Sequence, residues 1–145
     1  MANWCEGTLK LRGRPEIIAQ LCNECFVGVR ATIYNNDDLE ITSSDWCRVV
    51  GNGCAFIMEC NVGLSFSEGE TEISMALPLK EAYNINSVFW AELSKKYGLV
   101  IRIHAFEKGM EFERELEVHK GHYYTDKKIE YADYVWESPM PLLGG

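Results

Sequence analysis

Long hydrophobic runs and an excess of basic residues are both absent from this 145-residue chain. No apolar stretch approaches the roughly 20 residues that a membrane-spanning helix requires. The first residues show no basic region followed by an apolar stretch, so the sequence predicts no secretory signal and a cytoplasmic location. The net charge of −8 disfavours direct nucleic-acid binding, which needs a positive surface to displace counterions.

Internal repeats and low-complexity segments are absent as well, and the composition is not that of a disordered protein. Hydrophobic residues make up 47% and aromatic residues 12% of a chain long enough to bury the core of one domain. The acidic excess is uneven, because residues 1–36 carry +1, residues 37–81 carry −7 and residues 82–145 carry −2. This distribution suits solubility, a basic protein partner, or both.

The hydrophobic patterns predict an α+β fold. Residues 3–12 alternate as a strand, with Thr8, Lys10 and Arg12 on its polar face, and further alternation follows at 29–33, 73–77 and 99–105. Helical spacing covers roughly 15–27, and a second helix runs from a cap at Asn84 or Asn86 to Gly98.

This order of elements predicts a ferredoxin-like split βαβ sandwich, in which two helices cover one face of an antiparallel sheet. A C-terminal β-hairpin extends the sheet, with residues 122–136 as its final strand. We expect a single domain over residues 1–138 with an acidic insertion around 35–70, for which the sequence predicts no definite structure. Residues 139–145 are expected to form a loose tail.

Residues 110–118 carry the clearest surface feature, an almost perfect alternation of apolar residues and carboxylates. Successive side chains of a strand point to opposite faces, so the pattern predicts a half-buried strand with a row of acids on its wet face. The row consists of Glu111, Glu113, Glu115 and Glu117.

Two interpretations of this row stay open. Alternate strand residues lie about 6.6–6.8 Å apart, which is close to the separation of neighbouring phosphates, so the row could imitate a nucleic-acid backbone and occupy a basic protein's binding site. Alternatively, the row is an ordinary solvated face whose acids pair with Lys127 and Lys128 on the neighbouring strand.

Aromatic residues near the end of the chain are candidates for a protein-binding patch or a homodimer interface. They fall at both odd and even positions, so one face of a strand cannot bury them all, and Tyr and Trp dominate interface hot spots. The candidates are Tyr123, Tyr131, Tyr134 and Trp136.

A rival hypothesis is a small enzyme or a small-ligand-binding protein that uses the open sheet face. His119, His122 and Tyr123 could supply acid–base groups there, although the segment joins two strands, where exposed polar residues are ordinary. No nucleophile with a positioned base can be assembled beside them.

Cysteine spacing offers a third possibility. Cys22 and Cys25 lie three apart on one helix face, which is half the pattern of a zinc site. Both also lie on the helix's apolar stripe, and no second pair with this spacing follows, so core packing is the favoured interpretation. We therefore expect free thiols, no cofactor and no metal.

Two stretches resemble the YubB-type ferredoxin-like proteins of phages and plasmids. One is the Asn3-Trp4-Cys5 start, and the other is the segment Trp90–Leu99 followed by Phe106–Phe112. The Trp-Gly-Thr-Lys-Trp segment of many members is missing from this chain. The resemblance implies the ferredoxin-like fold and a mobile-element origin, but the family has no settled biochemical role.

The hypothesis that follows is a non-enzymatic accessory or inhibitor protein that acts through protein contacts. Its partner would be a basic host protein, such as a nucleic-acid-handling or defence enzyme, bound through the acidic row at residues 111–117.

Overall fold

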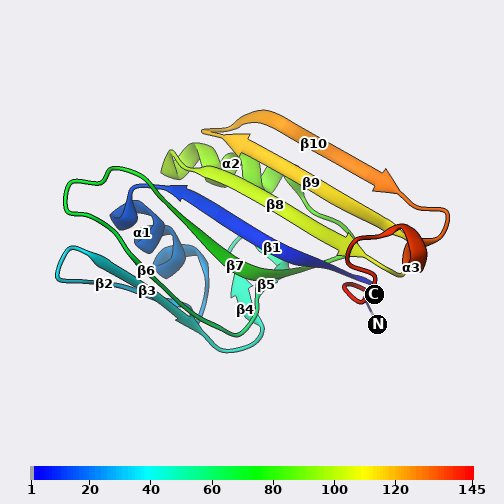
Figure 1. Ribbon diagram of the computed structural model, residues 1–145, viewed down its shortest axis with the longest axis horizontal. Coiled ribbons are helices and arrows are strands. Elements are labelled where there is room, and N and C mark those ends of the chain that lie inside the picture. Colours follow the sequence, from blue (N-terminus) through cyan, green and yellow to red (C-terminus); the bar gives the residue numbers. More distant parts are fainter. Residues whose placement is uncertain (1) are drawn as a thin grey trace.

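The computed structural model describes residues 2–145, which form a large sheet, a small sheet and three helices (Figure 1). In chain order the elements are β1 (Trp4–Gly13), α1 (Pro15–Cys25), β2 (Arg30–Tyr34), β3 (Asp38–Ser43), β4 (Cys47–Val49), β5 (Asn52–Ile57), β6 (Cys60–Ser65), β7 (Ile73–Ala82), α2 (Ser87–Tyr97), β8 (Val100–Glu107), β9 (Phe112–His119), β10 (His122–Glu130) and α3 (Tyr134–Glu137).

The large sheet contains seven strands in the order β10-β9-β8-β1-β7-β5-β4, and each pair of neighbours is antiparallel. The small sheet has the order β2-β3-β6 and is antiparallel too. The predicted α+β class with an antiparallel sheet is therefore confirmed.

Figure 1 shows α1 and α2 on the same side of the large sheet. They touch each other, because the Tyr97 hydroxyl of α2 donates a hydrogen bond to Glu24 of α1 at 2.8 Å. Helix α2 begins where the Asn86 side chain accepts the Phe89 N–H, and it ends at Gly98 in the left-handed conformation, with φ of 66°.

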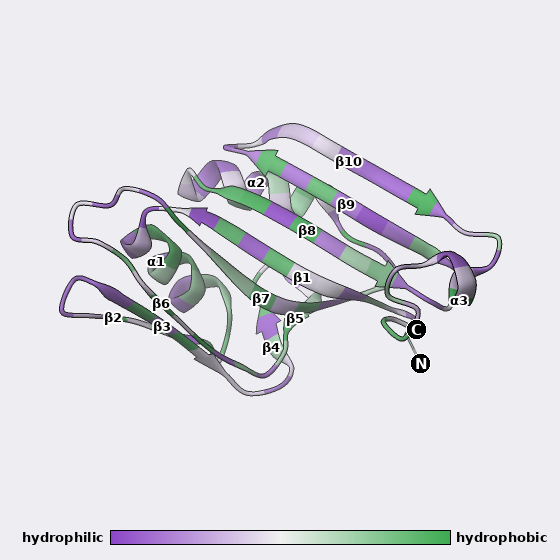
Figure 2. Cartoon of the chain, in the orientation of Figure 1, coloured by the Kyte–Doolittle hydropathy of each residue, from purple (hydrophilic) through white to green (hydrophobic). Residues whose placement is uncertain are grey.

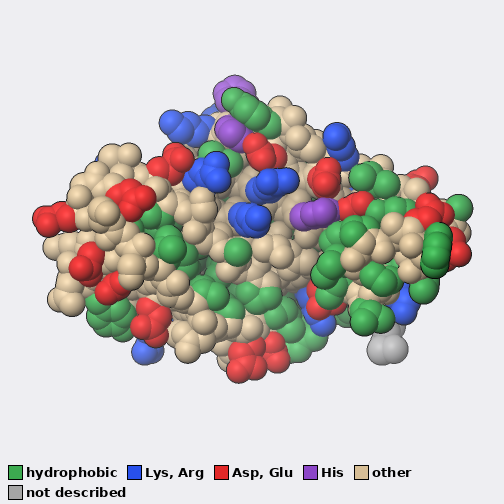
Figure 3. Space-filling view, viewed as in Figure 1, with side chains coloured by type: hydrophobic (Ala, Val, Ile, Leu, Met, Phe, Trp, Pro, Cys, Tyr) green, Lys and Arg blue, Asp and Glu red, His purple; other side chains and the backbone are tan. Residues whose placement is uncertain are grey.

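The opposite face of the large sheet is open over its centre. Side chains on β1 alternate between fully buried Leu9 and Leu11, which face the helices, and the polar Thr8, Lys10 and Arg12. Figure 2 shows this alternation as hydrophobic and hydrophilic bands along β1, β8 and β9. The polar set of each strand consequently lies on one exposed surface, which is the surface turned toward the viewer in Figures 1 and 3.

The insertion around residues 35–70 contributes β3 and β6 to the small sheet and β4 and β5 to one edge of the large sheet. The β2–β3 turn is made by Asn35 and Asn36, which have φ of 51° and 59°, as asparagines tolerate in tight turns. The small sheet is fixed to α1 by the Asn23 side chain, which hydrogen-bonds both the N–H and the carbonyl oxygen of Ala31 at 2.9 Å.

The last part of the chain differs from the prediction in two ways. Strand β10 ends at Glu130 rather than at 136, because Asp133 caps the short helix α3 by accepting the Trp136 N–H. The tail at 139–145 is not loose: the Gly144 N–H donates to a Glu6 carboxylate oxygen at 3.1 Å, and the Gly145 N–H donates to the Trp4 carbonyl at 3.0 Å. These contacts hold the tail against the edge of the open face.

Candidate functional site

The predicted row of four carboxylates is not present as a row. Strand β9 begins at Phe112, so Glu111 lies in the preceding turn with φ of 59°. The Glu107 carboxylate shapes that turn by accepting the N–H groups of Gly109 and Met110, at 2.6 and 2.8 Å. Within β9, Glu113 is only 6% exposed. The prediction of four solvated acids in register was therefore wrong.

The remaining two acids of the row face imidazole and guanidinium groups. Glu117 lies 2.7 Å from the Nε2 atom of His119 and 3.8 Å from the Nε atom of Arg102. Glu115 lies 3.7 Å from the Nε2 atom of His104. Because β8 pairs with β9 in a register that puts Arg102 opposite Glu117 and His104 opposite Glu115, the sheet itself creates these contacts.

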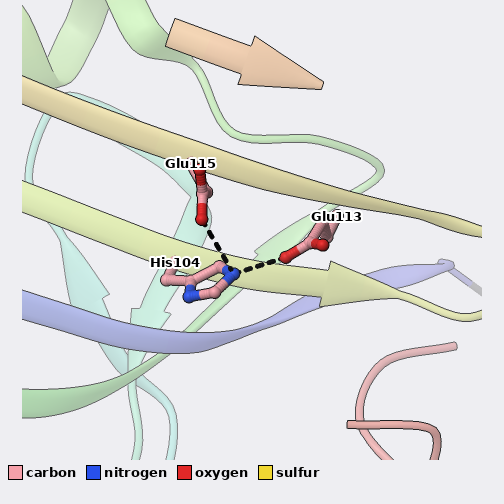
Figure 4. A group of neighbouring side chains, drawn as sticks. All are labelled: His104, Glu113 and Glu115. Carbon is pink, nitrogen blue, oxygen red and sulfur yellow. Dashed lines mark hydrogen bonds and ion pairs between the residues drawn. The ribbon is translucent and has the colours of Figure 1, made fainter. Parts of the chain in front are cut away.

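A cluster around His104 forms the most connected part of the open face (Figure 4). One carboxylate oxygen of Glu113 hydrogen-bonds His104 Nε2, and the other accepts the Tyr131 hydroxyl. The imidazole lies against the Phe106 ring, with 4.8 Å between the ring centres. We call His104, Glu113 and Glu115 the His104 cluster.

Tyr131 is held in its protonated form by its surroundings. Desolvation, followed by its hydrogen bond to Glu113, raises the pKa of Tyr131 above the ordinary value for a tyrosine. The phenol stabilises the fold as a donor at pH below about 10, and this contribution is lost as the pH rises through the higher folded-state pKa. At neutral pH, Tyr131 therefore fixes one oxygen of Glu113 and leaves the other toward His104.

Beside this cluster, the open face carries a hollow of about 300 Å³, and its lining includes three basic residues and the carboxylate of Glu117. Figure 3 shows Lys and Arg side chains gathered over the centre of this face. Lys10 is paired with Arg102 on one side and with Ala76 on the other, and Arg12 is paired with Ser74. Long basic side chains thus stand next to the short side chains of β7, and this difference in length produces the hollow. We call Lys10, Arg12 and Arg102 the basic triplet.

Only part of the basic triplet's charge is compensated inside the protein. Arg12 donates one hydrogen bond to the Ser74 hydroxyl at 2.8 Å, and Arg102 has only the 3.8 Å contact with Glu117. Over residues 2–145, Lys10 has neither an ion-pair nor a side-chain hydrogen-bond partner. The hollow is consequently a local positive region in a chain of net charge −8.

The three residues predicted to supply acid–base groups, His119, His122 and Tyr123, do not all lie on the same face of the sheet. His122 pairs with His119, and Tyr123 pairs with the buried Val118, so Tyr123 points to the helix side of the sheet rather than to the open face. His119 stacks flat on Tyr124, with 3.6 Å between the ring centres. Of the predicted group, only the two histidines share the open side.

The predicted aromatic patch is divided as well. Tyr134 is 1% exposed and donates to the Leu143 carbonyl at 2.9 Å, and Tyr131 is engaged with Glu113. Trp136 is 86% exposed and Tyr123 is 49% exposed. Tyr134 is buried because the C-terminal segment folds back over it, which no local pattern could indicate.

Cys22 and Cys25 lie in the core between α1 and its neighbours. Burial raises the pKa of Cys22 to about 12. All six cysteines in the described chain are free thiols. Among the described residues, the side chains that come together with metal-ligand spacing are those of the His104 cluster.

No pattern in the sequence indicated that the basic triplet or His104 belongs to a site. The polar alternation of Thr8, Lys10 and Arg12 was visible, but it became informative only when β1 proved to be a central strand paired with β8. A charged residue on a central strand of an open sheet has neighbours on both sides, whereas one on an edge strand does not.

No helix within residues 2–145 is long and apolar enough to cross a membrane. Comparison of the chain with protein-family models, with curated proteins and with solved structures gave no match. The resemblance to the YubB-type proteins stays a prediction.

Proposed function

We propose that this chain is a ferredoxin-like domain that binds a small phosphorylated ligand on its open sheet face. The strand order β8-β1-β7-β5, with α1 and α2 on one face, supports the ferredoxin-like assignment. In that assignment, β9 and β10 are the C-terminal hairpin extension. The small sheet is added by two insertions, because β2 and β3 lie between α1 and β5 and β6 lies between β5 and β7.

The observation that carries the proposed function is the basic triplet around the hollow. Guanidinium groups bind phosphate oxygens through paired N–H donors, and lysine adds a mobile point charge. Three cations against the single carboxylate of Glu117 favour a dianion over a neutral ligand. The volume of about 300 Å³ is at the lower limit for ligand sites, so it fits a phosphate with a small body.

The position of the hollow adds a second contact for such a ligand. Arg102 and His104 are alternate residues of β8 and point to the same face, about 6.7 Å apart along the strand. A phosphate held by the basic triplet therefore places the remainder of the ligand beside the His104 cluster. The protein would bind this ligand without transforming it.

We expect inorganic phosphate to bind to the wild-type protein and to bind at least about tenfold more weakly to the Arg102→Ala and Lys10→Ala variants. The expected loss follows from charge-assisted hydrogen bonds, each of which contributes about 1.5–3 kcal/mol. Isothermal titration calorimetry at low ionic strength measures the affinities.

The matched control is Lys127→Ala, which removes a cation from β10 on the same side of the sheet but outside the hollow. Its affinity for phosphate should equal that of the wild type. Equal phosphate affinities for all four proteins would contradict the proposed function, because binding would then not need the basic triplet. Equal losses in the three variants would contradict it as well, because binding would then follow overall charge.

A second proposal is the accessory protein that acts through protein contacts. Two features support this proposal, which are the acidity of residues 37–81 and an exposed apolar surface at α3. The acids of β9 do not support it, because they are paired or buried within the sheet. Figure 3 shows hydrophobic side chains gathered over α3 and the C-terminal segment. Exposed side chains in this region are those of Val135, Trp136, Met140 and Leu142. A solvated tryptophan among apolar neighbours is typical of an interface, with a basic host protein or with a second copy.

For this second proposal we expect Trp136→Ala to abolish capture of a specific protein from host-cell lysate. Buried interface tryptophans typically contribute about 2 kcal/mol or more to binding. Val88→Ala is the control, because Val88 is also exposed, at 59%, but lies on α2. Affinity purification with mass spectrometry compares the three proteins, and identical captured sets would contradict the proposal.

A further inference from the structure

We propose that the His104 cluster is a binding site for a divalent transition-metal ion. This inference does not depend on the phosphate ligand, because the two groups of residues are different. The cluster takes its imidazole from β8 and its two carboxylates from β9, and Figure 4 shows these side chains converging on the same point above the sheet.

The ligand atoms are already close to the positions that a metal ion needs. His104 Nε2 lies 3.7 Å from a Glu115 oxygen and within hydrogen-bond distance of Glu113, and the three ligand atoms all lie within 4.8 Å of one another. An ion about 2.0–2.2 Å from each ligand separates the ligands by about 3–3.5 Å.

Neighbouring groups orient these ligands as they do in known metal sites. The Tyr131 hydroxyl holds one oxygen of the buried Glu113, so the other oxygen points toward His104. The Phe106 ring supports the imidazole plane. Such outer contacts fix ligand orientation, and their loss typically weakens metal binding by about 10–100-fold.

The charges also fit a divalent cation. Two carboxylates and a neutral imidazole compensate a charge of +2. Within residues 2–145, the neighbouring Lys and Arg side chains form no ion pairs with these two carboxylates. Lys127 is paired with Glu115 in the β9–β10 register, but no ion pair joins the two side chains. Arg102 contacts Glu117, which lies outside the cluster. The carboxylates of the cluster therefore have His104 and Tyr131 as partners, and neither is a permanent cation.

The donor set indicates the class of metal. Imidazole and carboxylate ligands suit Mn²⁺, Fe²⁺ and Zn²⁺, whereas sites that prefer soft metals use thiolates. The His104 side chain is 39% exposed and that of Glu115 is 33% exposed, so the outer side of the cluster faces solvent. Three protein ligands leave coordination positions for water or for an oxygen of a bound ligand.

The test uses Mn²⁺ alone, because the exposed thiol of Cys54 could bind zinc elsewhere on the protein. Electron paramagnetic resonance measures free Mn²⁺ during titration of the full-length chain. We expect one ion per chain for the wild type, and at least tenfold weaker binding for His104→Ala and Glu115→Gln.

His119→Ala is the matched control. It removes an imidazole that contacts one carboxylate of the same strand, Glu117, but lies outside the cluster. This variant should bind Mn²⁺ as the wild type does, and circular dichroism verifies that every variant is folded. The proposal is overturned if the wild type binds no Mn²⁺, or if His104→Ala and Glu115→Gln bind it as tightly as His119→Ala. Phosphate affinity, measured separately, is unaffected by either result.

Discussion

Replacing Gly7 with alanine is expected to lower the free energy of unfolding by about 3 kcal/mol, at the upper end of the usual cost of overpacking. A Cβ atom at this position would lie 1.9 Å from the carbonyl oxygen of His104 and 2.7 Å from the Cα atom of Ala105. Both are backbone atoms of β8, so no side-chain rotation can remove the overlap. Strand β8 would have to move away from β1 at the residue that carries the His104 cluster.

The control for this prediction is Gly53→Ala on β5, where a Cβ atom would meet nothing within 4 Å. A surface change of this kind alters stability by about 0.5 kcal/mol or less. Urea unfolding followed by circular dichroism compares the two variants with the wild type. If both variants unfold at the wild-type urea concentration, the close approach of β1 and β8 at Gly7 does not exist.

Replacing Glu81 with leucine is expected to cost about 3 kcal/mol at neutral pH, because it removes the acceptor of three buried or partly buried donors. The Glu81 carboxylate is 1% exposed. It accepts hydrogen bonds from the Trp90 indole at 3.0 Å, the Asn52 amide at 2.8 Å and the Asn86 N–H at 2.6 Å. These bonds tie β7 to β5 and to the start of α2.

Glu81→Gln is the matched variant, because it keeps one acceptor oxygen and should lose less stability than Glu81→Leu. Chemical denaturation measures both. Equal losses for the two variants would contradict this prediction, because the acceptor oxygen that glutamine keeps would then contribute nothing.

The difference in stability between the wild type and Glu81→Gln is expected to depend on pH, because the Glu81 carboxyl is buried. Desolvation raises the pKa of Glu81 above its ordinary value of 4.5, against the opposing effect of its three hydrogen bonds and of Arg114. The folded state therefore retains the proton longer than the unfolded state does. The stability of the wild type relative to Glu81→Gln should be greatest below about pH 4.5 and should fall as the pH rises through the folded pKa. A difference that rises with pH would contradict this sign.

The helices and most large-sheet strands could be predicted because their signals are local. The Asn86 cap and the Gly98 end of α2 are properties of a few neighbouring residues, and the alternation along β1 or β8 needs only the strand itself. The short helix α3 and the buried Tyr134 could not be predicted, because they depend on a C-terminal segment that folds back onto the sheet.

The candidate site was only partly predictable for the same reason. The pattern at residues 110–118 correctly indicated which side of β9 carries the acids, but it could not indicate that Tyr131 and His104 would enclose Glu113. Burial of a charged side chain is decided by its neighbours in space. Those neighbours come from β8 and from the segment after β10, and only the strand order brings them together.

The hydrogen bond between the Gly145 N–H and the Trp4 carbonyl brings the last described residue to the first strand. This contact closes a loop that contains nearly all of the described chain. Since the entropic cost of closing a loop grows with its length, this contact gains little until the sheet between the ends has formed. We therefore expect the C-terminal segment to dock onto β1 only after the sheet has formed, so that its release is an early step of unfolding.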